Sequence, residues 1–119
     1  MERTKALWDT AQQLAALLKE EPAVVRFSEA KAALEEDGHG RALVESFNAL
    51  QRRAQVESVT RGAVSEELAA KLSGLYAAIE QSDAAVEYLL AQSALHGLVG
   101  ELYALLGTAA GVEAGFLEE

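Results

Sequence analysis

Apolar side chains recur along most of the chain at spacings of three and four residues, which is the spacing of one face of an α-helix. The clearest stripe of this kind consists of Leu68, Leu72, Leu75 and Ile79. Nowhere do β-branched and polar residues alternate over four or more positions, so the pattern predicts no strand. Together with the turn signals between the stripes, the spacing predicts helices over residues 4–20, 22–36, 41–60, 65–80 and 83–106.

Residues that start or stop helices separate these segments. Pro22 suits a first helical turn and disfavours the α conformation in the residue before it. Two glycines among residues 37–40 predict a turn. Gly62 is placed to end the third helix, and Ser65 is placed to cap the fourth. The Gln-Ser-Asp sequence at residues 81–83 offers a further stop and N-cap.

Short links join the predicted helices, and short links force consecutive helices to lie antiparallel. We therefore expect an all-α fold, a five-helix antiparallel bundle with long helical hairpins. Gly107 is the expected end of the last helix, so residues 1–107 are expected to form a single helical domain. Residues 108–119 contain three glutamates and are expected to be a loose acidic C-terminal tail.

The last predicted helix is apolar on more than one face and bears no lysine or arginine. A helix that is apolar nearly all round must be covered on nearly all sides. It is either the central core helix of a monomer or a helix shared with a second subunit. We expect the second, because four other helices can barely cover it. The expected interface of a homodimer or larger assembly consists of Leu95, Leu98, Val99, Leu102, Leu105 and Leu106.

The same helix is not expected to span a membrane. It contains Glu87 and Glu101 and lacks the basic flanks that membrane helices usually carry. No apolar run with signal-peptide character follows the N-terminal residues. The expected compartment is the cytoplasm.

The composition and motifs of the chain argue against several kinds of catalytic and metal-binding site. The chain has no cysteine, which excludes disulfides, thiolate metal sites, iron–sulfur clusters and a cysteine nucleophile. Glu36 and His39 have the Glu-x-x-His spacing of di-iron bundles, but the other ligands of such a site are missing, and His96 stands alone. There is no Gly-x-Ser-x-Gly sequence and no complete dinucleotide loop. The sequence therefore predicts no enzyme, no cofactor and no metal site.

Charge is negative overall and unevenly distributed. The formal net charge of −9 disfavours nucleic acid and anionic membranes as partners. All ten lysines and arginines lie at or before Lys71. The best basic cluster is Arg52 and Arg53, with Arg41 and Arg61 at the two ends of the same long helix; Arg52, Arg53 and Arg61 are the candidate RNA contacts. Surface ion pairing is the simplest interpretation of the cluster; the alternatives are contact with an acidic protein or with RNA, as in an RNA-contacting accessory protein.

Several short motifs occur in the order and spacing of a known family. They are the helix from Leu14 to Leu18, Phe27 after the proline, Leu43-x-x-x-Phe47-x-x-Leu50-Gln51, Ser65-Glu-Glu-Leu68, and Val86-x-Tyr88-Leu89-x-Ala91 leading into Leu95, Leu98 and Leu102. Over about residues 5–107 the chain resembles the YlbF/YmcA family, small helical bacterial proteins linked to competence, sporulation and biofilm development.

The resemblance implies a compact, all-α, cytoplasmic protein that dimerises or joins related helical proteins in larger complexes. Some family members belong to a complex that modulates ribonuclease Y and thereby messenger RNA maturation, without known catalysis of their own. Cysteines in that complex are implicated in iron–sulfur binding, and the present chain has none, so no cluster is implied for it. We therefore expect a non-enzymatic protein–protein interaction module with a regulatory function.

Overall fold

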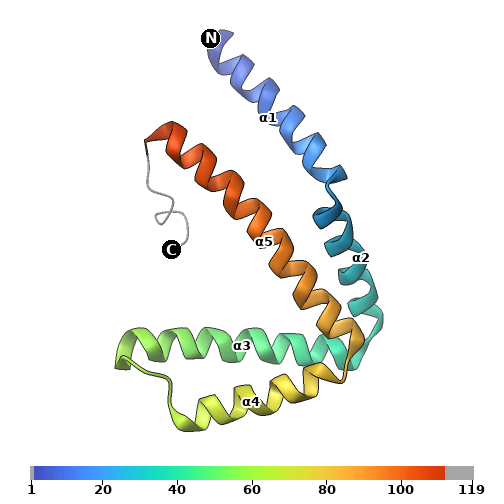
Figure 1. Cartoon of the computed structure of the whole chain (residues 1–119), viewed down its shortest axis with the longest axis vertical. Helices are drawn as coiled ribbons and strands as arrows, with labels where there is room; N and C mark the ends of the chain where they lie inside the picture. Colours follow the sequence, from blue (N-terminus) through green and yellow to red (C-terminus); the bar gives the residue numbers. More distant parts are fainter. Residues whose placement is uncertain (1, 112–119) are drawn as a thin grey trace. The chain divides into compact units, whose positions relative to one another are not determined.

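The computed structural model describes residues 2–111, which form five α-helices (Figure 1). No strand occurs within these residues. The predicted all-α class and the predicted number of helices are confirmed. The helices are α1 (Glu2–Glu20), α2 (Pro22–Glu36), α3 (Gly38–Arg61), α4 (Glu66–Glu80) and α5 (Asp83–Ala110).

The third helix begins earlier than predicted. Asp37 alone separates α2 from α3, so the predicted turn over residues 37–40 was wrong, and Gly38, His39 and Gly40 form the first turn of α3. Asp37 has an extended backbone, with φ −107° and ψ 90°, and its Oδ1 accepts a hydrogen bond from the Gly40 N–H at 3.0 Å. This cap satisfies an N–H that has no partner within the helix, so α3 can start directly after Asp37.

Gly40 lies where the start of α3 closely approaches the start of α5. It is buried, and a Cβ at this position would be 2.9 Å from Ser82 Oγ and 3.2 Å from the Asp37 carboxylate. Both side chains already serve as caps. Ser82 Oγ accepts from the Ala85 N–H at 3.2 Å, and Asp37 accepts from Gly40. A side chain at position 40 would therefore disturb at least one of the two caps.

We expect Gly40→Ala to lower the free energy of unfolding by about 1 kcal/mol, the typical cost of a lost N-cap. Gly38→Ala is the matched control, because nothing lies within 4 Å of its added Cβ and alanine is the better helix former by roughly 0.5–1 kcal/mol. Urea unfolding followed by circular dichroism should give a lower midpoint for Gly40→Ala and an equal or higher midpoint for Gly38→Ala. Equal midpoints for the two variants would contradict the close approach at Gly40.

The fifth helix ends later than predicted. Gly107, the expected end, is a buried residue inside α5, and the helix continues beyond it. Two alanines follow, which are strong helix formers, and Gly111, with φ +78°, then ends the helix in the left-handed conformation. Of the predicted tail over residues 108–119, residues 108–110 are helical, and residues 112–119 lie outside the part that the structure describes.

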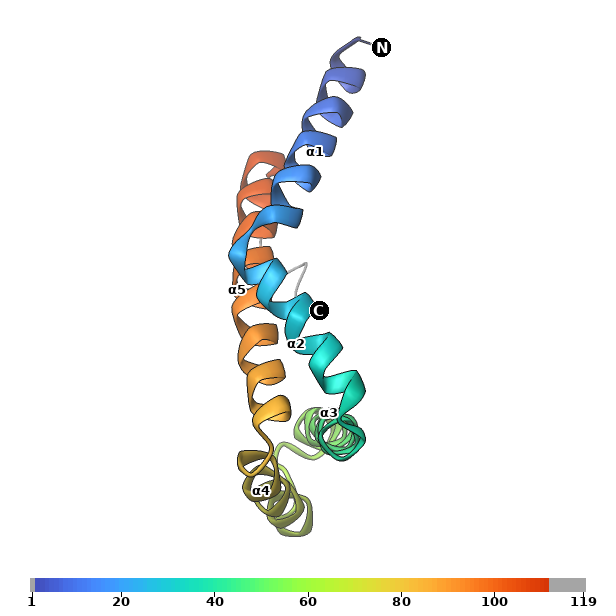
Figure 2. The same cartoon turned by 90° about the vertical axis from the view of Figure 1, so that its right-hand side faces the viewer.

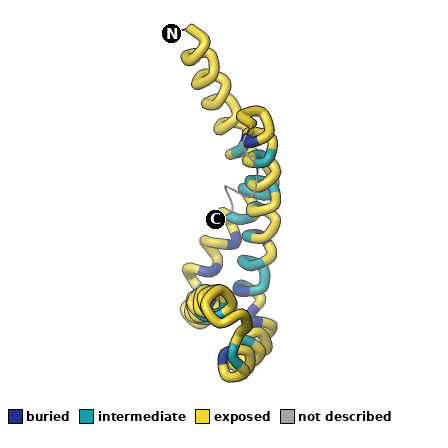
Figure 3. The backbone as a smooth tube through the Cα atoms, turned by 90° about the vertical axis from the view of Figure 1, so that its left-hand side faces the viewer, coloured by how far each residue is buried: buried dark blue, intermediate teal, exposed yellow. Residues whose placement is uncertain are grey.

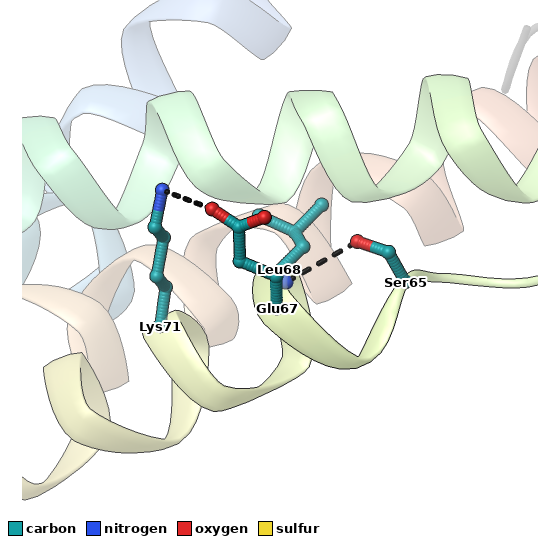
Figure 4. Close-up of polar contacts among 4 residues, drawn as sticks. All are labelled: Ser65, Glu67, Leu68 and Lys71. Carbon is teal, nitrogen blue, oxygen red and sulfur yellow. Dashed lines mark hydrogen bonds and ion pairs between the residues drawn. The ribbon is translucent and has the colours of Figure 1, made fainter.

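α3 and α4 form an antiparallel hairpin, as their short link predicted (Figures 1 and 2). Gly62 ends α3 with φ +78°, and Ser65 begins α4 by accepting a hydrogen bond from the Leu68 N–H at 3.2 Å (Figure 4). The predicted roles of Gly62 and Ser65 are thus confirmed. Figure 4 also shows Lys71 paired with Glu67 at 3.3 Å, an exposed i,i+4 ion pair of the kind that contributes a few tenths of a kcal/mol.

The main apolar core lies within residues 30–90. Phe47 of α3 is 7% exposed and meets the ring of Tyr76 edge-on, with the ring centroids 5.1 Å apart. Leu68 of α4 is 2% exposed. The core joins the end of α2, the first half of α3, the end of α4 and the start of α5, and its buried members are Leu34, Val44, Phe47, Ile79 and Ala85.

The chain divides into two compact units, and the boundaries between them fall inside α2 and α5. One contains residues 30–90, and the other contains the chain up to Glu29 together with the chain from Ala91 onward. α1 belongs to the second unit and has no buried residue, and Figure 3 shows it exposed along nearly its whole length. Large apolar side chains of α1, among them Leu7, Trp8 and Leu17, are therefore exposed. The single-domain boundary at residue 107 stays a prediction.

Candidate interaction surfaces

Two shallow apolar grooves lie between α1 and the C-terminal half of α5, within one unit. Leu14, Leu18 and Leu102 line both grooves. The first groove is completed by Ala11, Ala15, Val99, Tyr103 and Leu106, and the second by Leu17, Glu21 and Leu98. We call the two grooves and the exposed apolar side chains beside them the α1/α5 surface.

The structure places all six predicted interface residues on α5, five of them in its C-terminal half and Leu95 just before its midpoint. Leu105 and Leu106 are 66% and 54% exposed. The other four are half-buried, and they are Leu95, Leu98, Val99 and Leu102. Ala85 and Ala91 nearer the start of the helix are fully buried, although Leu90 beside them is 55% exposed.

α1 contributes apolar side chains that the sequence-based prediction left out of the interface. Leu7, Trp8 and Leu17 are 67%, 64% and 64% exposed, and Tyr103 of α5 is 53% exposed. The periodic stripe on α1 shows only that one face is apolar. Trp8 was the residue in the sequence that could have placed α1 in the interface, because aromatic residues are enriched at the centres of protein interfaces.

Arg52 and Arg53 lie on the side of α3 that faces away from its core residues. At about 100° per residue, Val56 is half a turn away from Phe47, and Val56 and Val59 are 61% and 86% exposed. Two shallow depressions along this side share Arg52 and Val56. Their other lining residues are Ala49, Arg53, Glu57, Gln55, Val59 and Thr60.

Arg61, the third candidate RNA contact, does not line these depressions. It is the last residue of α3 and lies near Glu57. The structure therefore brings Arg52 and Arg53 together with exposed valines and leaves Arg61 at the turn between α3 and α4.

Glu57 connects the end of α3 to the start of α4. Its Oε1 accepts a hydrogen bond from the Ser65 backbone N–H at 2.9 Å. This bond holds the pKa of the Glu57 carboxyl below its usual value; slight desolvation opposes the shift, and the Ser65 hydroxyl, Arg61 and Arg53 reinforce it. The Glu57 carboxylate is thus bound to the backbone of the turn between α3 and α4.

The lowered pKa of Glu57 predicts that the α3–α4 hairpin loses stability in acid. The ionised carboxylate is favoured more in the folded than in the unfolded protein, so its stabilisation is complete above the unfolded-state pKa and is lost as the pH falls through the lower folded-state pKa. In a plot of the urea unfolding midpoint against pH, Glu57→Gln should reduce the fall of the midpoint in acid. Glu45→Gln on the same helix should leave this fall unchanged. Superimposable curves for both variants would contradict the role of Glu57.

The two histidines lie on different helices, and both are exposed. His39 is in the first turn of α3, and His96 is on α5. Residues 2–111 contain no group of three His, Asp or Glu side chains that could hold a metal ion. The sequence-based predictions of no metal site and no catalytic residues stay predictions.

α5 is long and apolar enough to cross a membrane, by length and composition, and it is the one such helix among residues 2–111. Its 28 residues include Asp83, Glu87 and Glu101. Helices that are covered by protein can have the same length and composition, so this finding by itself is weak support for a membrane helix.

Comparison with known proteins identifies the family. The family described as "Control of competence regulator ComK, YlbF/YmcA" matches residues 7–109, which include parts of all five helices. A UPF0342 protein of Clostridium tetani (strain Massachusetts / E88) is 29% identical over 110 residues, which are 92% of this chain and 95% of that relative. No solved structure matches. The family description names a regulator and not a class of enzyme. With its five helices and the match over residues 7–109, the chain belongs to the YlbF/YmcA family.

Proposed function

We propose that this protein is a non-enzymatic regulatory module that self-associates through the α1/α5 surface and joins other helical proteins. One observation carries the proposal: α1 has no buried residue although it bears several large apolar side chains. Leu17 on α1 and Leu105 on α5 are 64% and 66% exposed. A second copy of the chain is the partner that we propose for this surface.

Burial of the exposed side chains would favour such an assembly. Each large apolar side chain contributes about 1.5–3 kcal/mol when it is removed from water. A two-fold symmetric interface contains each residue twice, so even a few such residues offset an association cost of roughly 4–15 kcal/mol. α5 has no lysine or arginine, and the centres of interfaces are depleted in charged residues.

The regulatory role that we propose is partner binding in the cytoplasm. The family includes proteins that join a complex acting on ribonuclease Y, and membership supports a similar role here. The chain has no cysteine, so the proposed contribution is a helical surface and not an iron–sulfur cluster. The partners that we propose are a second copy, related helical proteins and a ribonuclease complex.

Light scattering coupled to size-exclusion chromatography tests self-association. At tens of micromolar protein, we expect a mass of at least twice the 12.7 kDa of one chain. A mass of one chain over the whole concentration range would refute self-association. Partitioning of the protein into a detergent phase would show instead that α5 contacts lipid.

A further inference from the structure

α3 has a second apolar face, opposite the face that packs in the core. Val56 and Val59 on this face are 61% and 86% exposed. Ala49, Arg52, Val56 and Val59 follow one another at spacings of three, four and three residues, which is the a/d spacing along which two helices pack. Valine is a weaker helix former than alanine or leucine. Helix formation alone therefore does not account for exposed valines at these positions.

The charges on this face favour an acidic partner. α3 carries four arginines and two glutamates in a chain whose net charge is −9. Arg52 and Arg53 lie on the face, and neither guanidinium forms a salt bridge within 4 Å in the described range 2–111, although the charge of Arg53 helps to lower the pKa of Glu57. Glu57, which lies one turn from Arg53, is held by the Ser65 N–H. The guanidinium groups of Arg52 and Arg53 thus remain available to carboxylates of another molecule.

We propose that this outer face of α3, formed by Ala49, Arg52, Arg53, Val56 and Val59, binds an acidic amphipathic helix of a partner protein. Apolar side chains of the partner helix pack on the two valines, and carboxylates on its flanks pair with the two arginines. Arginine suits this role because its planar guanidinium binds a carboxylate through two hydrogen bonds.

Two other occupants fit this face less well. A second copy of α3, packed antiparallel, would bring two Arg52–Arg53 pairs close together, and like charges repel. A single-stranded RNA would require aromatic side chains for base stacking, and none lines the two depressions on this face.

Fluorescence anisotropy with two labelled peptides and the full chain tests the proposal. Both probes are helical peptides of about three heptads with leucine at the a and d positions; one carries glutamate at the e and g positions and the other carries lysine. We expect the protein to bind the glutamate peptide at least about tenfold more tightly, although the protein itself is acidic. Equal binding, or preference for the lysine peptide, would overturn the proposal.

Variants locate the binding site. Arg52→Glu and Val56→Ser should each weaken binding of the glutamate peptide about tenfold, and circular dichroism should show unchanged helix content because both side chains are exposed. Lys71→Glu on α4 is the matched control, since it makes the same change of charge elsewhere in the same unit. An equal loss in Lys71→Glu would overturn the proposal.

Two further measurements separate this face from other surfaces and ligands. Leu17→Glu, on the α1/α5 surface, should leave binding of the glutamate peptide unchanged, and a loss would place the peptide on that surface instead. A short RNA oligonucleotide should not compete with the peptide. Competition by RNA with a steep salt dependence would assign the face to nucleic acid and overturn the proposal.

Discussion

Leu17→Glu and Leu105→Glu are each expected to convert the self-associated protein into monomers. Both side chains are about two-thirds exposed in the single chain, so a glutamate there leaves the fold of one copy intact. In the proposed assembly the same glutamate would be buried without a partner, which costs about 3–5 kcal/mol. Light scattering coupled to size exclusion should show association weakened by roughly a hundredfold or more.

Ala16→Glu is the control for this experiment. It adds the same charge next to Leu17, but at about 100° per residue it lies nearly half a turn from both Leu14 and Leu18, on the side of α1 away from both grooves. Self-association should persist in this variant. Val99 and Leu102 are less suitable positions, because both are half-buried within one chain and line the groove between α1 and α5. If Leu17→Glu and Leu105→Glu both stay associated, the interface lies outside the α1/α5 surface.

Phe47→Ala should produce the largest loss of stability among single substitutions in the unit of residues 30–90. Phe47 is 7% exposed, belongs to the core of residues 30–90 and packs edge-on against Tyr76. Truncating a buried phenylalanine to alanine removes its apolar burial and leaves a cavity, at a cost of about 3–5 kcal/mol. That is a large part of the roughly 5–15 kcal/mol by which a domain is stable.

Thermal unfolding followed by circular dichroism measures this effect. At a fixed protein concentration, the Tm of Phe47→Ala should fall by on the order of 15 °C. Val59→Ala on the same helix is the control, because Val59 is 86% exposed and such substitutions usually change stability by less than about 0.5 kcal/mol. A similar Tm for both variants would show that the core does not depend on Phe47.

Local signals along the chain predicted the helices well. Ser65 and Gly62 act as predicted because each works through a hydrogen bond or a backbone conformation within a few residues of itself. The turn predicted over residues 37–40 was wrong, because contacts of these residues decide their conformation as much as the residue types do. Two glycines favour a turn, but the Asp37 cap and the close approach at Gly40 stabilise a helical first turn instead.

The candidate interfaces were only partly predictable. The apolar excess of α5 was visible in the sequence and indicated a covered surface. The sequence did not show that Leu7, Trp8 and Leu17 of α1 remain exposed. Likewise, Arg52 and Arg53 were recognisable as a basic pair, but not as neighbours of two exposed valines on the outer side of α3.

The sequence by itself determined the all-α class, the number of helices, most of their ends and the family, because these depend on the spacing of apolar residues and on caps that act within about one helical turn. Only the tertiary structure decided which apolar faces are covered. Phe47 and Val56 lie on the same helix, yet one is buried and the other is 61% exposed. The difference arises because burial depends on contacts with residues far away in the chain, which no local pattern specifies.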